Sequence, residues 1–94
     1  MITLTQLQVD ELTTKLLGLA EEPEEAIARE CLDMIDGLTI TPATPAHAEY
    51  MAAELDDAVL VIEDDIGMFA EETPRRASLI RSFRAAADKI RASA

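Results

Sequence analysis

The feature that most constrains the fold of this chain is an apolar stripe between residues 44 and 73. Its members recur at alternating spacings of four and three, which places them on one face of a long helix. The opposite side is acidic, so the apolar and anionic faces are separated. The pattern therefore predicts a long amphipathic helix at the centre of the fold. The stripe consists of Ala48, Ala52, Leu55, Val59, Ile62, Ile66 and Phe69, and the acidic residues are Asp56, Asp57, Glu63, Asp64 and Glu71.

Two helices are expected before this stretch. The first covers about residues 5–19, with Thr3 or Thr5 as the N-cap. The second covers residues 23–36, because Pro23 suits a first helical turn and Gly37 can take the left-handed position that closes a helix. The chain thus begins with two helical segments of moderate length.

A connector and two longer helices are expected to follow. Residues 38–43 have an extended character because proline restricts the residue before it, and Ile40 is expected to enter the core. The central helix then runs from Pro45 to about residue 72, with Thr44 as its expected N-cap. A fourth helix covers about residues 74–92, and the short junction before it predicts an antiparallel hairpin.

The fold class predicted from these segments is all-α. No stretch alternates β-branched and polar residues over the length of a strand, which argues against a sheet. The prediction is one domain over residues 1–94, a small four-helix bundle in which the long third helix forms an antiparallel hairpin with the fourth. A chain of this size buries roughly 60 to 65% of the surface that its unfolded form exposes, which allows only a modest core. Dimerisation would stabilise the fold by burying more surface.

Charge is distributed unevenly along the chain. The formal net charge is −11, with −16 in residues 1–73 and +5 in residues 74–94. Such an acidic chain repels nucleic acid and anionic membranes at long range. No apolar run approaches the roughly 20 residues that span a bilayer. The residues after Met1 have neither the basic nor the apolar region of a signal peptide, so we expect none. We expect a cytoplasmic protein that contacts no membrane.

The charged helices each allow two interpretations. The arginines of the fourth helix can pair with the acidic third helix across the hairpin, at roughly 0 to 1 kcal/mol for each exposed pair. Alternatively Arg76, Arg81 and Arg84 form a contact for nucleic acid or phosphate, which the acidic remainder disfavours. The acidic face is likewise either a solvated surface or a binding face for a basic protein.

The sequence indicates no catalytic or metal-binding pattern. Asp33 and Asp36 lack the spacing of a calcium loop, and no Glu-x-x-His pair occurs on the third helix. His47 has no nucleophile or acid at a usable spacing, and Cys31 is typical of a small buried apolar residue. We therefore expect no enzyme activity, no cofactor and no metal.

Residues 55–67, Leu-Asp-Asp-Ala-Val-Leu-Val-Ile-Glu-Asp-Asp-Ile-Gly, resemble the second helix of acyl carrier proteins, which are also small, acidic and four-helical. That family carries phosphopantetheine on a serine directly before the leucine. Glu54 occupies this position here, so the resemblance implies a related helix without carrier function.

The leading functional hypothesis is a small acidic interaction module, an inhibitor or adaptor of the kind that phages and mobile elements encode. It would present its acidic helical face to a basic protein surface. One alternative is an assembly module that forms homodimers or larger homo-oligomers through helices three and four. A second alternative is nucleic-acid contact through the fourth helix. The residues expected to bind the partner are Asp56, Asp57, Glu63, Asp64 and Glu71, and the alternative basic face is Arg76, Arg81 and Arg84.

Overall fold

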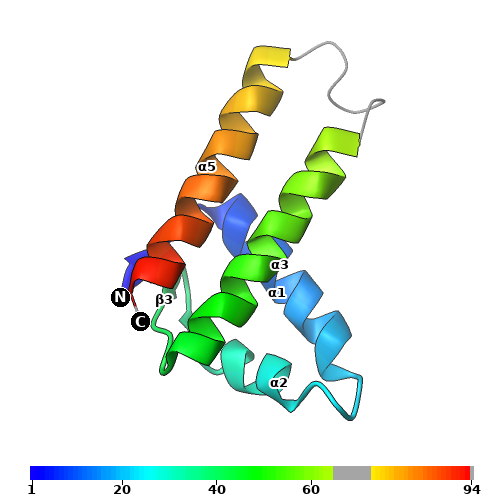
Figure 1. Ribbon diagram of the computed structural model, residues 1–94, viewed down its shortest axis with the longest axis vertical. Coiled ribbons are helices and arrows are strands. Elements are labelled where there is room, and N and C mark those ends of the chain that lie inside the picture. The colour runs from blue at the N-terminus through cyan, green and yellow to red at the C-terminus, as the bar shows by residue number, and fades with distance from the viewer. Residues whose placement is uncertain (65–72, 94) are drawn as a thin grey trace.

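The computed structural model describes residues 1–64 and 73–93, without the side chains of residues 63, 64, 73 and 74 (Figure 1). Helices dominate this part of the chain, and three strands of two residues each accompany them. The helices are α1 (Gln6–Ala20), α2 (Ala26–Leu32), α3 (Pro45–Asp64) and α5 (Thr73–Ala92). The strands are β1 (Ile2–Thr3), β2 (Ile35–Asp36) and β3 (Thr39–Ile40).

The expected hairpin of the third and fourth helices is confirmed as α3 and α5. The two helices run antiparallel, side by side, and make the most extensive contact between any two elements described (Figure 1). In the view of Figure 1, α1 crosses behind them and α2 lies below. The far half of the hairpin, nearest residues 64 and 73, extends beyond both of these helices.

Capping side chains fix the starts of two helices where the sequence indicates them. The Thr5 hydroxyl accepts a hydrogen bond from the Gln8 amide, and the Gln8 side chain accepts one from the Thr5 amide, which together form a capping box. In the same way the Thr44 hydroxyl accepts from the amide of His47 at the start of α3. Local chemistry therefore sets these two helix starts.

The all-α prediction is wrong in one respect, because a small antiparallel sheet is present. Its strand order is β1-β3-β2, and Ile40 of β3 lies opposite both Ile2 and Ile35. Gly37, expected to close the second helix, has a φ of 59° in the turn between β2 and β3. Helix α2 is accordingly shorter than predicted and ends at Leu32. Strands of two residues are too short for an alternating pattern to reveal them.

The core is one cluster to which α1, α2, α3, α5 and the sheet all contribute buried apolar side chains. As predicted, Ile40 is fully buried in it, and so are Leu12 and Leu16 of α1. The central stripe is confirmed over its described part, since its first four members are buried and Ile62 is half-buried; Ile66 and Phe69 lie outside the described residues. The buried members of the two long helices include Ala48, Met51, Ala52, Leu55, Val59, Phe83, Ala87 and Ile90.

None of the helices described in residues 1–64 and 73–93 combines the length and the apolar character needed to cross a membrane.

Candidate functional site

Arg91, in the last turn of α5, engages two carboxylates of α3. Its Nε lies 2.8 Å from Glu49 Oε2, and its Nη2 lies 2.8 Å from Asp56 Oδ2. The hydrogen bond from Arg91 lowers the pKa of the Glu49 carboxyl below its ordinary value. Asp56, one of the predicted partner-binding residues, is therefore paired within its own chain. This contact agrees with the interpretation in which arginines of the fourth helix pair with the acidic third helix.

Asp57, the next residue, pairs with a different helix. Its Oδ2 lies 2.6 Å from Nζ of Lys15 on α1, and its side chain is 56% exposed. Consecutive helical residues point about 100° apart, so Asp56 and Asp57 can pair with different neighbouring helices. The predicted acidic face is thus divided between the α5 side and the α1 side of α3. The side chains of Glu63 and Asp64, and all of Glu71, lie outside the described residues.

The α1 side of α3 gathers more carboxylates than cations. Burial raises the pKa of Glu54, the Lys15 ammonium counters this, and the charges of Asp57 and Glu25 raise it further. Glu25, at the N-terminus of α2, accepts a hydrogen bond of 2.7 Å from the Tyr50 hydroxyl. We use the name acidic side for the surface formed by Glu25, Glu54 and Asp57, which also contains Lys15.

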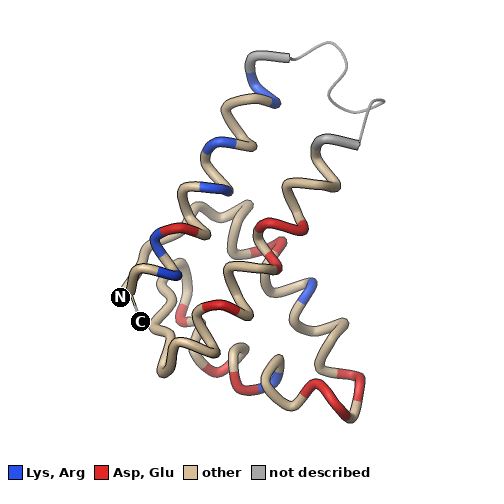
Figure 2. The backbone as a smooth tube through the Cα atoms, viewed as in Figure 1, with Lys and Arg blue, Asp and Glu red and all other residues tan. Residues whose placement is uncertain are grey.

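Only part of the acidic side could be found from the sequence. Glu54 precedes Asp57 by one helical turn, so helical spacing would have placed it on the same surface. Lys15 and Glu25 come from other elements, and no local pattern connects them to α3. Figure 2 shows the general division, with acidic residues on α3 and near the α1–α2 connection and basic residues along α5.

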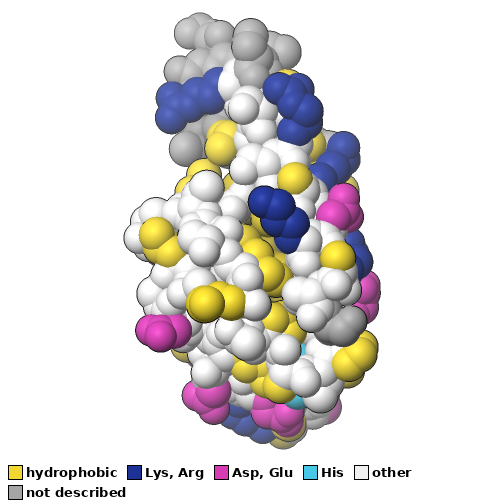
Figure 3. All heavy atoms as spheres, turned by 90° about the vertical axis from the view of Figure 1, so that its left-hand side faces the viewer, with side chains coloured by type: hydrophobic (Ala, Val, Ile, Leu, Met, Phe, Trp, Pro, Cys, Tyr) yellow, Lys and Arg dark blue, Asp and Glu magenta, His cyan; other side chains and the backbone are white. Residues whose placement is uncertain are grey.

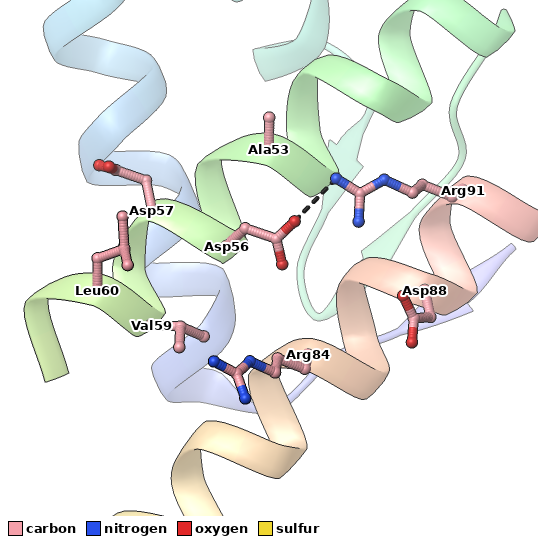
Figure 4. Close-up of a pocket in the computed structure, with 8 residues that line it drawn as sticks. All are labelled: Ala53, Asp56, Asp57, Val59, Leu60, Arg84, Asp88 and Arg91. Atoms are coloured by element: carbon pink, nitrogen blue, oxygen red, sulfur yellow. Dashed lines mark hydrogen bonds and ion pairs between the residues drawn. The ribbon is translucent and has the colours of Figure 1, made fainter. Parts of the chain in front are cut away.

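An open groove lies between α3 and α5 on the side away from α1 (Figure 4). Its volume is about 570 Å³. Apolar side chains line its α3 wall, where Leu60 is 56% exposed. The groove has acidic and basic side chains around an apolar strip, an arrangement suited to contact with the surface of another protein. Its lining residues are Ala53, Asp56, Asp57, Val59, Leu60, Arg84, Asp88 and Arg91.

The three arginines of the alternative basic face have different surroundings. Arg76 is half-buried and donates from Nε to the carbonyl of Ile62 at 3.3 Å, so it faces α3. Arg84 lines the groove, and Arg81 is exposed on α5. Seen from the α5 side, Lys and Arg side chains spread along the upper part of the molecule with apolar side chains between them (Figure 3). Arg76 is therefore directed toward α3, whereas Arg81 and Arg84, three residues apart, are neighbours on the exposed surface of α5.

The remaining reactive side chains are held in structural contacts. His47 bonds Thr44 through Nδ1 at 2.6 Å and Glu30 through Nε2 at 2.8 Å, which joins the start of α3 to α2. Cys31 is fully buried, and burial, with a smaller contribution from Glu30, raises the pKa of its thiol to about 11. Among the residues described, no group of three or more His, Cys, Asp or Glu is arranged to hold a metal ion.

Comparison with known proteins yields no match to a protein-family model, to a curated protein or to a solved structure. The functional argument therefore rests on the residues of this chain.

Proposed function

We propose that this chain is a non-enzymatic protein-interaction module, an inhibitor or adaptor acting in the cytoplasm. Its acidic side, formed by Glu25, Glu54 and Asp57, would receive a basic surface of a partner protein. The observation that carries the proposal is that Glu54 lies within electrostatic reach of two further carboxylates, Asp57 and Glu25, and of one ammonium group, that of Lys15, which pairs with Asp57.

The electrostatics of the acidic side favour a cationic partner. Burial raises the pKa of Glu54, and the charges of Asp57 and Glu25 raise it further, so ionising Glu54 has a cost that Lys15 offsets only in part. An arginine or lysine from a partner would stabilise the ionised form and relieve the repulsion among the three carboxylates. The net charge of −11 would also draw a basic protein in at long range and speed its association.

The ion pairs within the chain determine which acidic residue is more available to a partner protein. Asp56 is held by Arg91, whose guanidinium also bonds Glu49, so a partner would have to break a two-carboxylate contact to reach it. Asp57 has one ammonium partner on a flexible lysine, and more than half of its side chain is exposed. We therefore place the principal contact at Asp57 and Glu54.

Nucleic-acid contact through α5 is the weaker candidate. Two of its arginines, Arg76 and Arg91, bond groups of α3. Repulsion from an acidic chain would further oppose a phosphate backbone.

The proposal is tested by affinity capture from the native cell lysate with three forms of the full chain. The wild type is compared with the double variant Glu54→Gln/Asp57→Asn and with Lys15→Gln. We expect a stoichiometric basic protein to bind the wild type, and its affinity to fall about tenfold or more in the double variant because two charged contacts are lost.

Lys15→Gln is the matched control. It breaks the same Lys15–Asp57 ion pair but leaves all three carboxylates in place. Binding should therefore be kept or strengthened in this variant, and it should weaken with added salt. A partner that binds the double variant as tightly as the wild type would contradict the proposal.

A further inference from the structure

We infer that Ser78 of α5 is a phosphorylation site for a serine kinase that recognises arginines before its target residue. The sequence around it is Arg75-Arg76-Ala77-Ser78-Leu79. Kinases of this class bind arginines two and three positions before the serine through acidic side chains, and they favour an apolar residue directly after it. The site shares no residue with the acidic side, so the inference is independent of the proposed function.

The part of α5 that carries Ser78 is exposed and weakly anchored. Ser78 itself is exposed, and none of the described side chains of residues 75–82 is buried. In Figure 1 this part of the hairpin extends beyond α1 and α2. By contrast, the next turns of α5 contribute to the core the side chains of Phe83, Ala86, Ala87 and Ile90.

Weak anchoring makes the serine available in the conformation that a kinase needs. A kinase binds the residues around its target as an extended chain, so the helix has to open locally at Ser78. A segment without buried side chains opens at a lower free-energy cost than the core. Residues 75–79 can therefore leave the helix while the later turns of α5 stay packed.

Recognition also requires the two arginines to exchange contacts within the chain for acidic groups of the kinase. Both Arg75 and Arg76 interact with other groups of the folded chain. The bond from Arg76 Nε to the Ile62 carbonyl is 3.3 Å long, beyond the usual range of about 2.7–3.2 Å. Bonds between a guanidinium and a carboxylate are shorter and stronger. The exchange of this bond therefore favours the kinase complex.

The modification is a phosphoryl transfer from ATP. Ser78 Oγ forms a bond to the γ-phosphorus, and the bond from that phosphorus to the oxygen bridging to the β-phosphate breaks. ADP leaves, and the hydroxyl proton passes to the catalytic carboxylate of the kinase. Arg75 and Arg81 lie three residues to either side of Ser78, so the re-formed helix places the new phosphate between two guanidinium groups. Phosphorylation would thus reduce the positive charge at this end of α5.

Phosphorylation of the full chain tests the inference. The chain is incubated with ATP and the catalytic subunit of cyclic-AMP-dependent protein kinase, and the product is analysed by mass spectrometry with fragment sequencing. We expect phosphate at Ser78 in the wild type and none in Ser78→Ala. Ser82→Ala is the control, because Ser82 is also exposed on α5 but has its arginine directly before it, and this variant should react like the wild type.

Two outcomes of that experiment would overturn the inference. One is phosphate at another residue in place of Ser78. The other is a full chain that takes up no phosphate while a free peptide of residues 73–82 does, because the helix would then shield the serine.

A pair of double variants tests how Ser78 is recognised. Arg75→Gln/Arg76→Gln removes the two arginines before the serine, and Arg81→Gln/Arg84→Gln removes the same charge after it. The kcat/KM of the kinase should fall about tenfold or more with the first variant and change less than about twofold with the second. Equal effects would mean that the kinase responds only to the positive charge of α5, and the inference would fail.

Discussion

The guanidinium of Arg91 and the carboxylate of Asp56 lie 2.8 Å apart and join the last turn of α5 to the middle of α3. Because Arg91 also bonds Glu49, it holds three charges in one network across the hairpin. Both carboxylates are partly exposed, so solvent screens the network and its contribution to stability is small.

Arg91→Gln should therefore lower the stability of the domain. The loss should appear as a small fall in Tm, because the pairs it removes are exposed to solvent. Lys89→Gln is the control, since Lys89 is an exposed cation on the same helix. Thermal unfolding in low and high salt measures both variants. The difference between them should shrink in high salt, and a difference that does not respond to salt would argue against an ionic origin.

Gln8 should contribute far more to stability than Gln6. The Gln8 side chain is 3% exposed, accepts from the Thr5 amide and donates to Ser82 Oγ at 2.8 Å, so it links the α1 cap to α5. Gln8→Ala should cost about 1–3 kcal/mol, because it leaves a buried amide without its acceptor and cuts the link to α5. Gln6 donates to Asp10 at the surface, its one side-chain partner among the described residues, and Gln6→Ala should cost under about 0.5 kcal/mol. Urea unfolding compares the two, and equal losses would contradict the assigned role of Gln8.

Two glycines should respond to alanine in opposite directions. Gly37 has a φ of 59°, so Gly37→Ala should destabilise the domain by about 1–2 kcal/mol. Gly18 lies within α1, and an added Cβ would meet nothing within 4 Å. Gly18→Ala should therefore stabilise by about 0.5–1 kcal/mol. Chemical denaturation gives both signs, and a stabilising Gly37→Ala would mean that the β2–β3 turn does not need the left-handed conformation.

Stability should decline as the pH rises above 9. Burial raises the pKa of the Cys31 thiol from 9.0 to about 11, so the unfolded chain ionises first. This contribution is complete below pH 9 and is lost as the pH rises toward 11. Burial and Glu25 also raise the pKa of Tyr50, which adds a decline in the same direction at higher pH. Cys31→Ala should reduce the slope between pH 9 and 10, measured by urea unfolding; an unchanged slope would show that Cys31 is not its source.

Sequence reasoning was reliable where the determining contacts are local. Thr44 could be recognised as a cap because its partner is three residues away, and Val59 as a core residue because helical spacing repeats around it. Gly37 was misassigned because a helix end and a tight turn both use a positive φ. The same conformation serves both, and only the pairing of β2 with β3 distinguishes them.

The candidate site was harder to predict because its partners are distant in the chain. The partner of Asp56 lies 35 residues away, and that of Asp57 lies 42 residues away. The acidic stripe of α3 has a clear period, but that period contains no information about which neighbouring helix supplies a cation to each residue. The division of the stripe between α5 and α1 therefore emerges only from packing.

The pairing of Ile2 with Ile40 places constraints on the order of folding. β2 and β3 are adjacent in sequence and can pair locally around Gly37. β1 is separated from β3 by α1 and α2, so it can pair with β3 only after these helices have folded back. We therefore expect β1 to join last and to open first. The amide of Leu4, which donates to the Leu38 carbonyl, should then exchange its proton through a partial opening that leaves the amides of α3 protected. Native-state hydrogen exchange would reveal this, and equal protection at the two places would instead indicate that the sheet and the hairpin unfold as one unit.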